Sequence, residues 1–249
     1  MPTECSARTC VIMPVYNEAA SIRGVLDSVR RVFDGWVVVV DDGSTDATGP
    51  ALEARQDVWL VRHPQNRGYG ASLRSGFKAA LELGAESVIT MDCDGQHEPR
   101  HVAEFCADLA SGGADIVSGS RYLPGSLAAG AVPAGRRDVN ERITETVNAV
   151  TGWSLTDAFC GFKAYGAEAL RRIVTQEPGY AMPLEMWARA WQEGLRVREM
   201  PVERIYNDHD RSFGRDLDDP ERRYAYYTAV WERALGEGPA RCDTGSGGQ

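Results

Sequence analysis

The sequence contains no long hydrophobic run and no excess of basic residues. Its longest purely aliphatic stretch is Val37–Val40, whereas a membrane-spanning helix needs about 18 or more apolar residues. The segment from Met1 to Arg8 lacks the apolar core of a signal peptide. Aspartate and glutamate total 36 against 27 lysines and arginines, a net charge of −9, so no nucleic-acid partner is expected. We therefore expect a cytoplasmic protein that contacts a membrane, if at all, only peripherally.

Cysteine is sparse and scattered. The six cysteines form no C-x-x-C pair and are not clustered with the four histidines, which argues against a zinc site or a disulfide framework. Cys10, Cys93 and Cys160 lie in apolar segments and are expected to be small buried residues. His97 and His101 are spaced to share one helix face. We favour capping and surface contacts over a metal pair for these two histidines.

The remaining composition is that of one globular domain. Hydrophobic residues make up 43% of the 249 residues, enough for a full core. β-Branched runs alternate with helical patterns up to Ser118, and Asn17 is a candidate cap for the first helix. This alternation predicts an α/β fold with a mostly parallel, doubly wound sheet. The expected strands are Thr9–Val15, Trp36–Val40, Val58–Arg62, Ser87–Met91 and Ala114–Ser118.

The pattern changes after Arg121. Helices are expected at Arg137–Val150, Met182–Glu193 and Asp219–Leu235, and strands at Ala158–Tyr165 and Leu195–Ile205. Glycine, alanine and proline in Leu123–Gly135 indicate a mobile loop, and Asn207–Asp218 is a charged loop. Residues 236–249 are glycine-rich and are expected to be a disordered tail.

Carboxylates follow two of the expected parallel strands directly. Ligands of a parallel sheet bind beyond the carboxyl ends of its strands. Asp92 and Asp94 stand on the same side of an extended segment, and such oxygen ligands suit a divalent cation that is shared with substrate phosphates. Asp41 and Asp42 follow a fully apolar strand, where one of them is expected to bind the base or ribose of a nucleotide; turn formation is the alternative role.

Five ordered motifs resemble those of family 2 glycosyltransferases with the GT-A fold. They are Pro14–Glu18, Val40–Asp46, Asn66–Gly70, Met91–Pro99 and Gly119–Tyr122, and the later segments Asp157–Lys163 and Arg211–Gly214 agree with them. Within the family, the chain is most similar to polyprenyl-phosphate mannosyl- and glucosyltransferases, dolichol-phosphate mannose synthase among them. The resemblance implies a single GT-A domain over residues 9–235, with a nucleotide-sugar half (9–122) and an acceptor half (123–235).

The resemblance also implies roles for individual residues. The nucleotide-sugar would be bound by Pro14, Tyr16, Glu18, Asp41, Asp42, Arg67, Asp92, Arg121 and Arg211. Mg²⁺ or Mn²⁺ would be held by Asp92, Asp94 and Gln96, and acceptor phosphates by Arg137 and Arg215. Asp157 and Glu185 are candidate catalytic bases for a hydroxyl acceptor, with Asp157 preferred. The alternative role of Asp157 is to hold an arginine such as Arg137 in place.

The implied reaction is an inverting, metal-dependent transfer of a sugar from a UDP- or GDP-sugar. The favoured acceptor is a polyprenyl phosphate at the cytoplasmic membrane face, and the alternative is a small-molecule metabolite. Asn140 and Thr144 replace the usual serine and asparagine of the middle helix, and Ser212–Arg215 alters a glycine-serine-lysine loop, so the acceptor side departs most from the family. A catalytically silent nucleotide-binding module is the alternative of another class. Self-association stays open.

Overall fold

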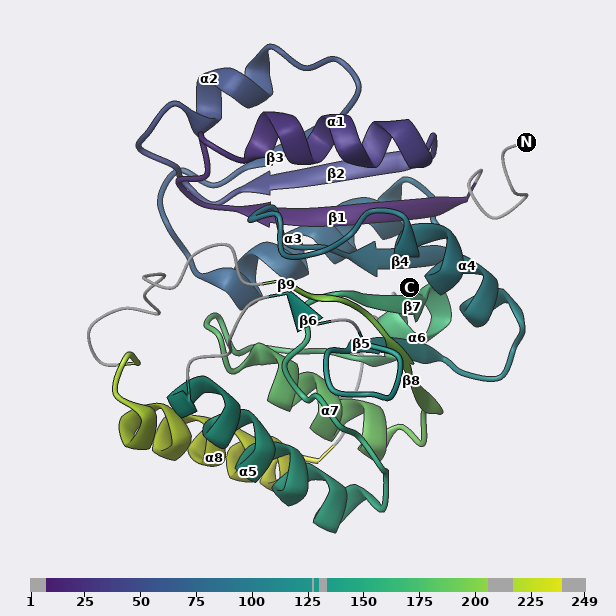
Figure 1. The fold of residues 1–249 in the computed structure, drawn as a ribbon, viewed down its shortest axis with the longest axis vertical. Coiled ribbons are helices and arrows are strands. Elements are labelled where there is room, and N and C mark those ends of the chain that lie inside the picture. The colour runs from purple at the N-terminus through teal and green to yellow at the C-terminus, as the bar shows by residue number, and fades with distance from the viewer. Residues whose placement is uncertain (1–7, 127, 130–133, 206–216, 239–249) are drawn as a thin grey trace, which may run out of the picture.

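Strands alternate with helices through the first half of the chain, and helices dominate the second half (Figure 1). The computed structural model describes residues 8–126, 128–129, 134–205 and 217–238. The strands are β1 (Thr9–Val15), β2 (Trp36–Asp41), β3 (Trp59–Arg62), β4 (Ser87–Thr90), β5 (Ile116–Ser120), β6 (Ala128–Ala129), β7 (Lys163–Gly166), β8 (Val197–Pro201) and β9 (Arg204–Ile205). The helices are α1 (Ile22–Val32), α2 (Thr48–Glu53), α3 (Tyr69–Glu82), α4 (His101–Ala110), α5 (Ala134–Thr151), α6 (Ala167–Arg172), α7 (Met182–Gln192) and α8 (Pro220–Gly236).

The central sheet has seven strands in the order β3-β2-β1-β4-β7-β5-β8. Its neighbouring strands pair in parallel, except that β7 runs antiparallel to both β4 and β5. Strand β1 is buried along its whole length, as expected where helices cover both faces of a sheet. The predicted α/β fold with a mostly parallel central sheet is confirmed. The parallel strands end at one edge, so the motif-bearing loops that follow them lie together.

Successive side chains of the strands point to opposite faces of the sheet, and each face packs in its own hydrophobic core. Ile12 and Val38 pack in the core that includes α3, α5, α6, α7 and α8, whereas their neighbours Val11 and Val37 pack in the core that includes α1, α2 and α4. In Figure 1, α5 and α8 lie side by side at the opposite end of the molecule from α1 and α2. The predicted burial of the cysteines at positions 10, 93 and 160 is confirmed.

Four segments of the second half differ from the predicted elements. The strand expected to begin at Ala158 begins only at Lys163, because the backbone N–H groups of Ala158 and Phe159 donate to side-chain oxygens of Thr144 and Asp157 at 3.1 and 3.2 Å. The strand expected over 195–205 is split into β8 and β9, and the short helix α6 was not predicted. Helix α8 continues to Gly236, one residue into the predicted tail.

The two predicted loops are only partly visible. Residues 123–125 form a turn, β6 follows, and α5 begins at Ala134, inside the first loop. Residues 207–216 of the second loop and residues 239–249 of the tail lie outside the described residues. In the ranges that the structure describes, no helix combines the length and the apolar character needed to cross a membrane.

Asn17 does not cap α1, contrary to the prediction. It adopts a left-handed backbone with φ of 55°, a conformation that asparagine tolerates better than most residues. Its backbone N–H donates to Ser44 Oγ at 3.0 Å, and its Oδ1 accepts from the Thr45 N–H at 2.8 Å. Asn17 therefore joins the turn after β1 to the turn after β2, and α1 begins only at Ile22.

We expect Gly76→Ala to destabilise the fold by about 1–3 kcal/mol, the usual cost of overpacking. A Cβ at Gly76 in α3 would lie 2.4 Å from Cγ2 of the buried Ile12 in β1. The matched control is Gly24→Ala in α1, where a Cβ has no neighbour within 4 Å. That change is expected to stabilise by about 0.5–1 kcal/mol through helix propensity. Urea unfolding of both variants measures the difference, and equal effects would contradict this packing.

Candidate active site

A cavity of about 330 Å³ lies at the sheet edge where β1, β2 and β4 end. Its lining falls into two groups, which we call the N-terminal wall and the C-terminal wall. The N-terminal wall consists of Pro14, Tyr16, Glu18, Asp42, Asn66, Gly68, Tyr69, Ser72, Asp92, Cys93, Asp94 and Gln96. The C-terminal wall consists of Arg121, Tyr122, Val139, Asn140, Phe159, Gly161, Gly179, Tyr180, Pro183, Arg223 and Tyr227.

Asp42 anchors the loop after β3 to the turn after β2. Its Oδ1 accepts hydrogen bonds from His63 Nδ1 at 2.6 Å and from the Arg67 backbone N–H at 3.0 Å. Its Oδ2 accepts from the Gly68 N–H at 2.8 Å. The carboxylate is almost fully buried but still reaches the cavity wall. Asp42 therefore fixes the loop after β3 at the cavity, which Tyr16, a residue that is 44% exposed, also lines.

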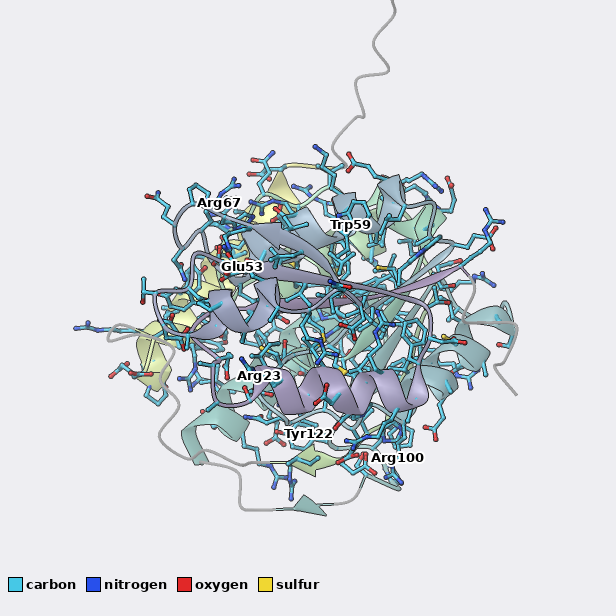
Figure 2. All side chains as sticks on the ribbon, turned by 90° about the horizontal axis from the view of Figure 1, so that it is seen from above. Arg23, Glu53, Trp59, Arg67, Arg100 and Tyr122 are labelled. Atoms are coloured by element: carbon cyan, nitrogen blue, oxygen red, sulfur yellow. The ribbon has the colours of Figure 1, made fainter. Side chains whose placement is uncertain are left out.

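Two residues that were expected to bind the nucleotide lie off the wall. Asp41 is buried, with Oδ1 accepting from the Ser44 N–H at 2.9 Å and Oδ2 paired with Arg62 Nε at 3.1 Å. These contacts give Asp41 the turn-forming role that was its alternative. The side chain of Arg67 is exposed, and it lies at the periphery of the molecule in Figure 2.

Asp92, Asp94 and Gln96 reach the wall from one short turn after β4. Asp94 Oδ1 accepts from the Gln96 N–H at 2.9 Å, and Asp92 Oδ1 accepts from the Tyr69 hydroxyl at 3.1 Å. A Cβ at position 161 would lie 2.5 Å from Asp92 Oδ2, so only glycine leaves room for this carboxylate. The turn is therefore packed in a way that fixes Asp92.

The side chains of this turn fit a hard divalent cation. Carboxylate and amide oxygens are the ligands that Mg²⁺ and Mn²⁺ prefer. Over the described ranges, no three histidine, cysteine or acidic side chains converge to form a metal cage. A cation here would therefore take its other ligands from substrate phosphates and water, which is the usual arrangement for Mg²⁺.

The two histidines after this turn have separate roles. His97 Nδ1 accepts a hydrogen bond from the Asp92 backbone N–H at 3.0 Å, which requires the neutral ring. Burial lowers the pKa of His97 and so favours that form. The ring nitrogens of His101 instead contact Glu104 and Glu203. Both histidines are buried, so the surface contacts that were expected for them are not found.

The basic C-terminal wall is organised around the ion pair of Arg121 and Asp157. Arg121 Nε and Nη2 donate to the two oxygens of Asp157 at 2.7 and 2.9 Å, a bidentate geometry that fixes the guanidinium plane. Asn140 Nδ2 also donates to Asp157 Oδ1 at 2.8 Å. Burial raises the pKa of Asp157, but Arg121 and Asn140 outweigh that effect, and its pKa lies below the usual range.

This geometry favours the positioning role of Asp157 over the catalytic one. The side chain is fully buried and is not on the cavity wall, and a carboxylate with a lowered pKa is a weak base. The arginine that it holds is Arg121 and not Arg137. Arg137 is exposed and lies with its guanidinium carbon 5.9 Å from the ring centre of Tyr122, which is on the wall.

Glu185 does not face the acceptor side of the cavity. It is buried in α7, where its Oε2 accepts from the backbone N–H groups of Gln176 and Glu177 at 2.8 and 2.6 Å. It therefore shapes the chain ahead of α7, and we do not keep it as a candidate base. Arg211 and Arg215 lie outside the described residues.

Two wall residues, Tyr180 and Arg223, were not singled out in the sequence. Tyr180 stacks on Tyr69 with ring centres 5.8 Å apart, and Phe159 contacts Tyr227 with centres 4.6 Å apart. Arg223 of α8 is 4% exposed. The signal for Arg223 was its spacing, because it stands four residues before Tyr227, on the apolar helix face.

Comparison with known proteins identifies the family of this chain. Residues 10–174 match the family model of glycosyl transferase family 2. The chain is 31% identical over 203 residues to the undecaprenyl-phosphate mannosyltransferase of Micrococcus luteus, covering 78% of this chain and 82% of that protein. It is also 31% identical over 204 residues to the polyprenol monophosphomannose synthase of Mycolicibacterium smegmatis, covering 78% of this chain and 76% of that protein.

The same fold occurs in a solved structure. Glucosyl-3-phosphoglycerate synthase from Mycobacterium tuberculosis, in complex with Mn²⁺, uridine diphosphate and phosphoglyceric acid, superposes with a TM-score of 0.70 at 19% identity. The match covers 96% of this chain and 81% of that one. At this identity the likeness shows the fold alone. The family match over most of the chain, together with the two relatives at 31% identity, shows that this chain belongs to glycosyl transferase family 2 and is a glycosyltransferase.

Proposed function

We propose that the protein transfers a sugar from a nucleotide-sugar to a polyprenyl phosphate, with inversion and with Mg²⁺ or Mn²⁺. The observation that carries the proposal is that Asp92, Asp94, Gln96 and Arg121 all line one cavity. A cation site that shares a cavity with a fixed arginine suits a reaction between two phosphate-bearing substrates. The relatives named for undecaprenyl phosphate and polyprenol monophosphomannose support the lipid acceptor.

The N-terminal wall would bind the donor. Pro14, Tyr16, Glu18 and Asp42 frame the nucleotide, and the exposed ring of Tyr16 offers a face on which a base can stack. Asp92, Asp94 and Gln96 would hold the cation. When bound, it neutralises the charge that grows on the departing nucleoside diphosphate.

The acceptor phosphate attacks from the side of the C-terminal wall. One of its oxygens bonds to the anomeric carbon while the bond from that carbon to the diphosphate breaks on the opposite face. A phosphate monoester is already anionic near neutral pH and needs no base to remove a proton. Because no base is needed, Asp157 can stay paired with Arg121 during this reaction. Arg121 would bind phosphate, and Asp157 would hold Arg121 in place.

Binding of the donor can be tested by thermal shift against nucleotide-sugars with Mn²⁺. A ligand at 100 times its dissociation constant stabilises the native state by about 2.7 kcal/mol. We expect one uridine or guanosine sugar to raise the melting temperature, and excess EDTA to cancel the shift. Full turnover in EDTA would reject the metal role.

Transfer to lipid can be tested with radiolabelled nucleotide-sugar and polyprenyl phosphate. We expect label to enter the organic phase only in the presence of the divalent cation. The alternative is a small-molecule acceptor. The net charge of −9 favours this alternative, because an anionic lipid surface repels a negatively charged protein. Label that stays in water while a soluble acceptor is glycosylated would replace the lipid proposal with that alternative. The lipid reaction would take place at the cytoplasmic membrane face.

Tyr69→Phe is expected to raise the Mn²⁺ concentration needed for half-maximal activity about tenfold. The change removes the hydroxyl that donates to Asp92 Oδ1, and such support of a metal ligand is typically worth 10–100-fold. Tyr224→Phe, off the cavity wall, is the control. Identical Mn²⁺ titrations for wild type and Tyr69→Phe would contradict the expected role.

A further inference from the structure

The two walls of the cavity carry charges of opposite sign. Among the described residues that line it, the C-terminal wall holds two arginines, Arg121 and Arg223, and no carboxylate. The N-terminal wall holds no lysine or arginine and four carboxylates: Glu18, Asp42, Asp92 and Asp94. Such a division favours a cation at one wall and an anion at the other.

The two arginines are held in different ways. The guanidinium of Arg121 is paired with the Asp157 carboxylate. Arg223 Nη1 and Nη2 donate to the backbone carbonyls of Leu217 and Gly135 at 2.7 and 2.9 Å. These two bonds fix Arg223 between the chain before α8 and the start of α5. A guanidinium fixed before a ligand arrives loses less entropy on binding it.

The C-terminal wall that includes Arg223 also holds apolar and aromatic side chains. Val139, Phe159, Pro183 and Tyr227 lie on the same wall. Burial raises the pKa of Tyr227 to about 12, so its phenol stays neutral near pH 7 and adds no negative charge. One fixed positive charge beside apolar rings suits an anionic group that is attached to an apolar chain.

We propose that Arg223 binds the phosphate of the acceptor and that Phe159 and Tyr227 line the path of the chain attached to it. Arg223 lies in helix α8, beyond residues 10–174, which match the family model. The proposal rests on the transferase function proposed above and adds a residue that binds the acceptor. The ligand chemistry is a phosphate monoester, whose source is either a lipid or a soluble metabolite.

Binding of small phosphate monoesters tests the proposal for the lipid source and for the soluble source of the acceptor. Geranyl phosphate serves for the lipid source and phosphoglyceric acid for the soluble one, each titrated calorimetrically into protein with Mn²⁺ and nucleoside diphosphate. Arg223→Gln is expected to weaken binding of at least one of them by about 10- to 100-fold, which corresponds to a lost hydrogen bond to a charged group. Arg222→Gln, at the exposed neighbouring position, should bind within about twofold of wild type, the margin of a surface substitution.

Geraniol separates recognition of the phosphate from a merely structural role. If Arg223 reads the phosphate, Arg223→Gln lowers the affinity ratio of geranyl phosphate to geraniol, and Arg223→Lys, which keeps the charge, restores part of it. Unchanged phosphate binding in Arg223→Gln, equal losses for geranyl phosphate and geraniol, or no binding of either phosphate to wild type would overturn the proposal. Failure of the transferase function is distinct: no nucleotide-sugar would be turned over, while phosphate binding would still depend on Arg223.

Discussion

Replacing Asp94 with asparagine is expected to lower kcat by about 10²–10³-fold, as losing one electrostatic contact to a developing charge typically does. This change costs about 3–4 kcal/mol of barrier, at roughly 1.4 kcal/mol per factor of ten. The amide keeps the size of the side chain and an oxygen for the Gln96 N–H, so the turn is expected to stay folded. Steady-state release of nucleoside diphosphate measures the loss.

Glu98→Gln is the matched control for Asp94→Asn. Glu98 belongs to the same acidic motif, but its side chain is exposed and is not on the cavity wall. Its removal lowers the local negative charge by the same amount without touching the proposed cation site. Equal losses in the two variants would mean that general electrostatics, and not a ligand at position 94, supports turnover.

Asp157→Asn is expected to destabilise the protein by about 3–5 kcal/mol, because it leaves the charge of Arg121 without its buried partner. Activity should fall with stability, since Arg121 loses its fixed orientation on the wall. Asp115→Asn is the control, because Asp115 makes the same bidentate contact with Arg196, at 3.0 and 2.8 Å, on the surface. An exposed pair of this kind is worth about 0–1 kcal/mol.

A double-mutant cycle with Arg121→Gln separates positioning from base catalysis at Asp157. If Asp157 acts through Arg121, the two changes are strongly non-additive in kcat/KM, because either one alone already disables the pair. If Asp157 were the base, Asp157→Asn would abolish turnover at full stability, and the pH–rate profile would lose its acidic limb. That combination would contradict the positioning role.

The sequence predicted the parts of the site that depend on local pattern. Asp42, Asp92 and Asp94 were placed correctly because each follows an apolar strand, and parallel strands end at one edge of a sheet. Tyr16 and Arg121 reached the cavity wall for the same reason. The end of a strand can be predicted because the hydrophobic pattern that marks a buried strand spans only a few residues.

The remaining features depend on contacts between distant parts of the chain. Asp157 and Arg121 are separated by 36 positions. The residues next to each of them in the sequence do not predict that the two side chains pair. The antiparallel β7 lies between β4 and β5 in the sheet, and both partner strands are distant from it in the sequence. Arg223 looks like one basic residue among several in α8, and only the packing of that helix against α5 and α7 places it on the cavity.

The configuration of the product tests the central claim most directly. An α-linked nucleotide-sugar, a short-chain polyprenyl phosphate and Mn²⁺ would be incubated with the protein, and the anomeric coupling of the product measured by proton magnetic resonance. We predict a β-linked glycosyl phosphate that forms only with the cation. An α-linked product, or the same product formed in excess EDTA, would contradict a single in-line displacement between the acidic and basic walls of this cavity.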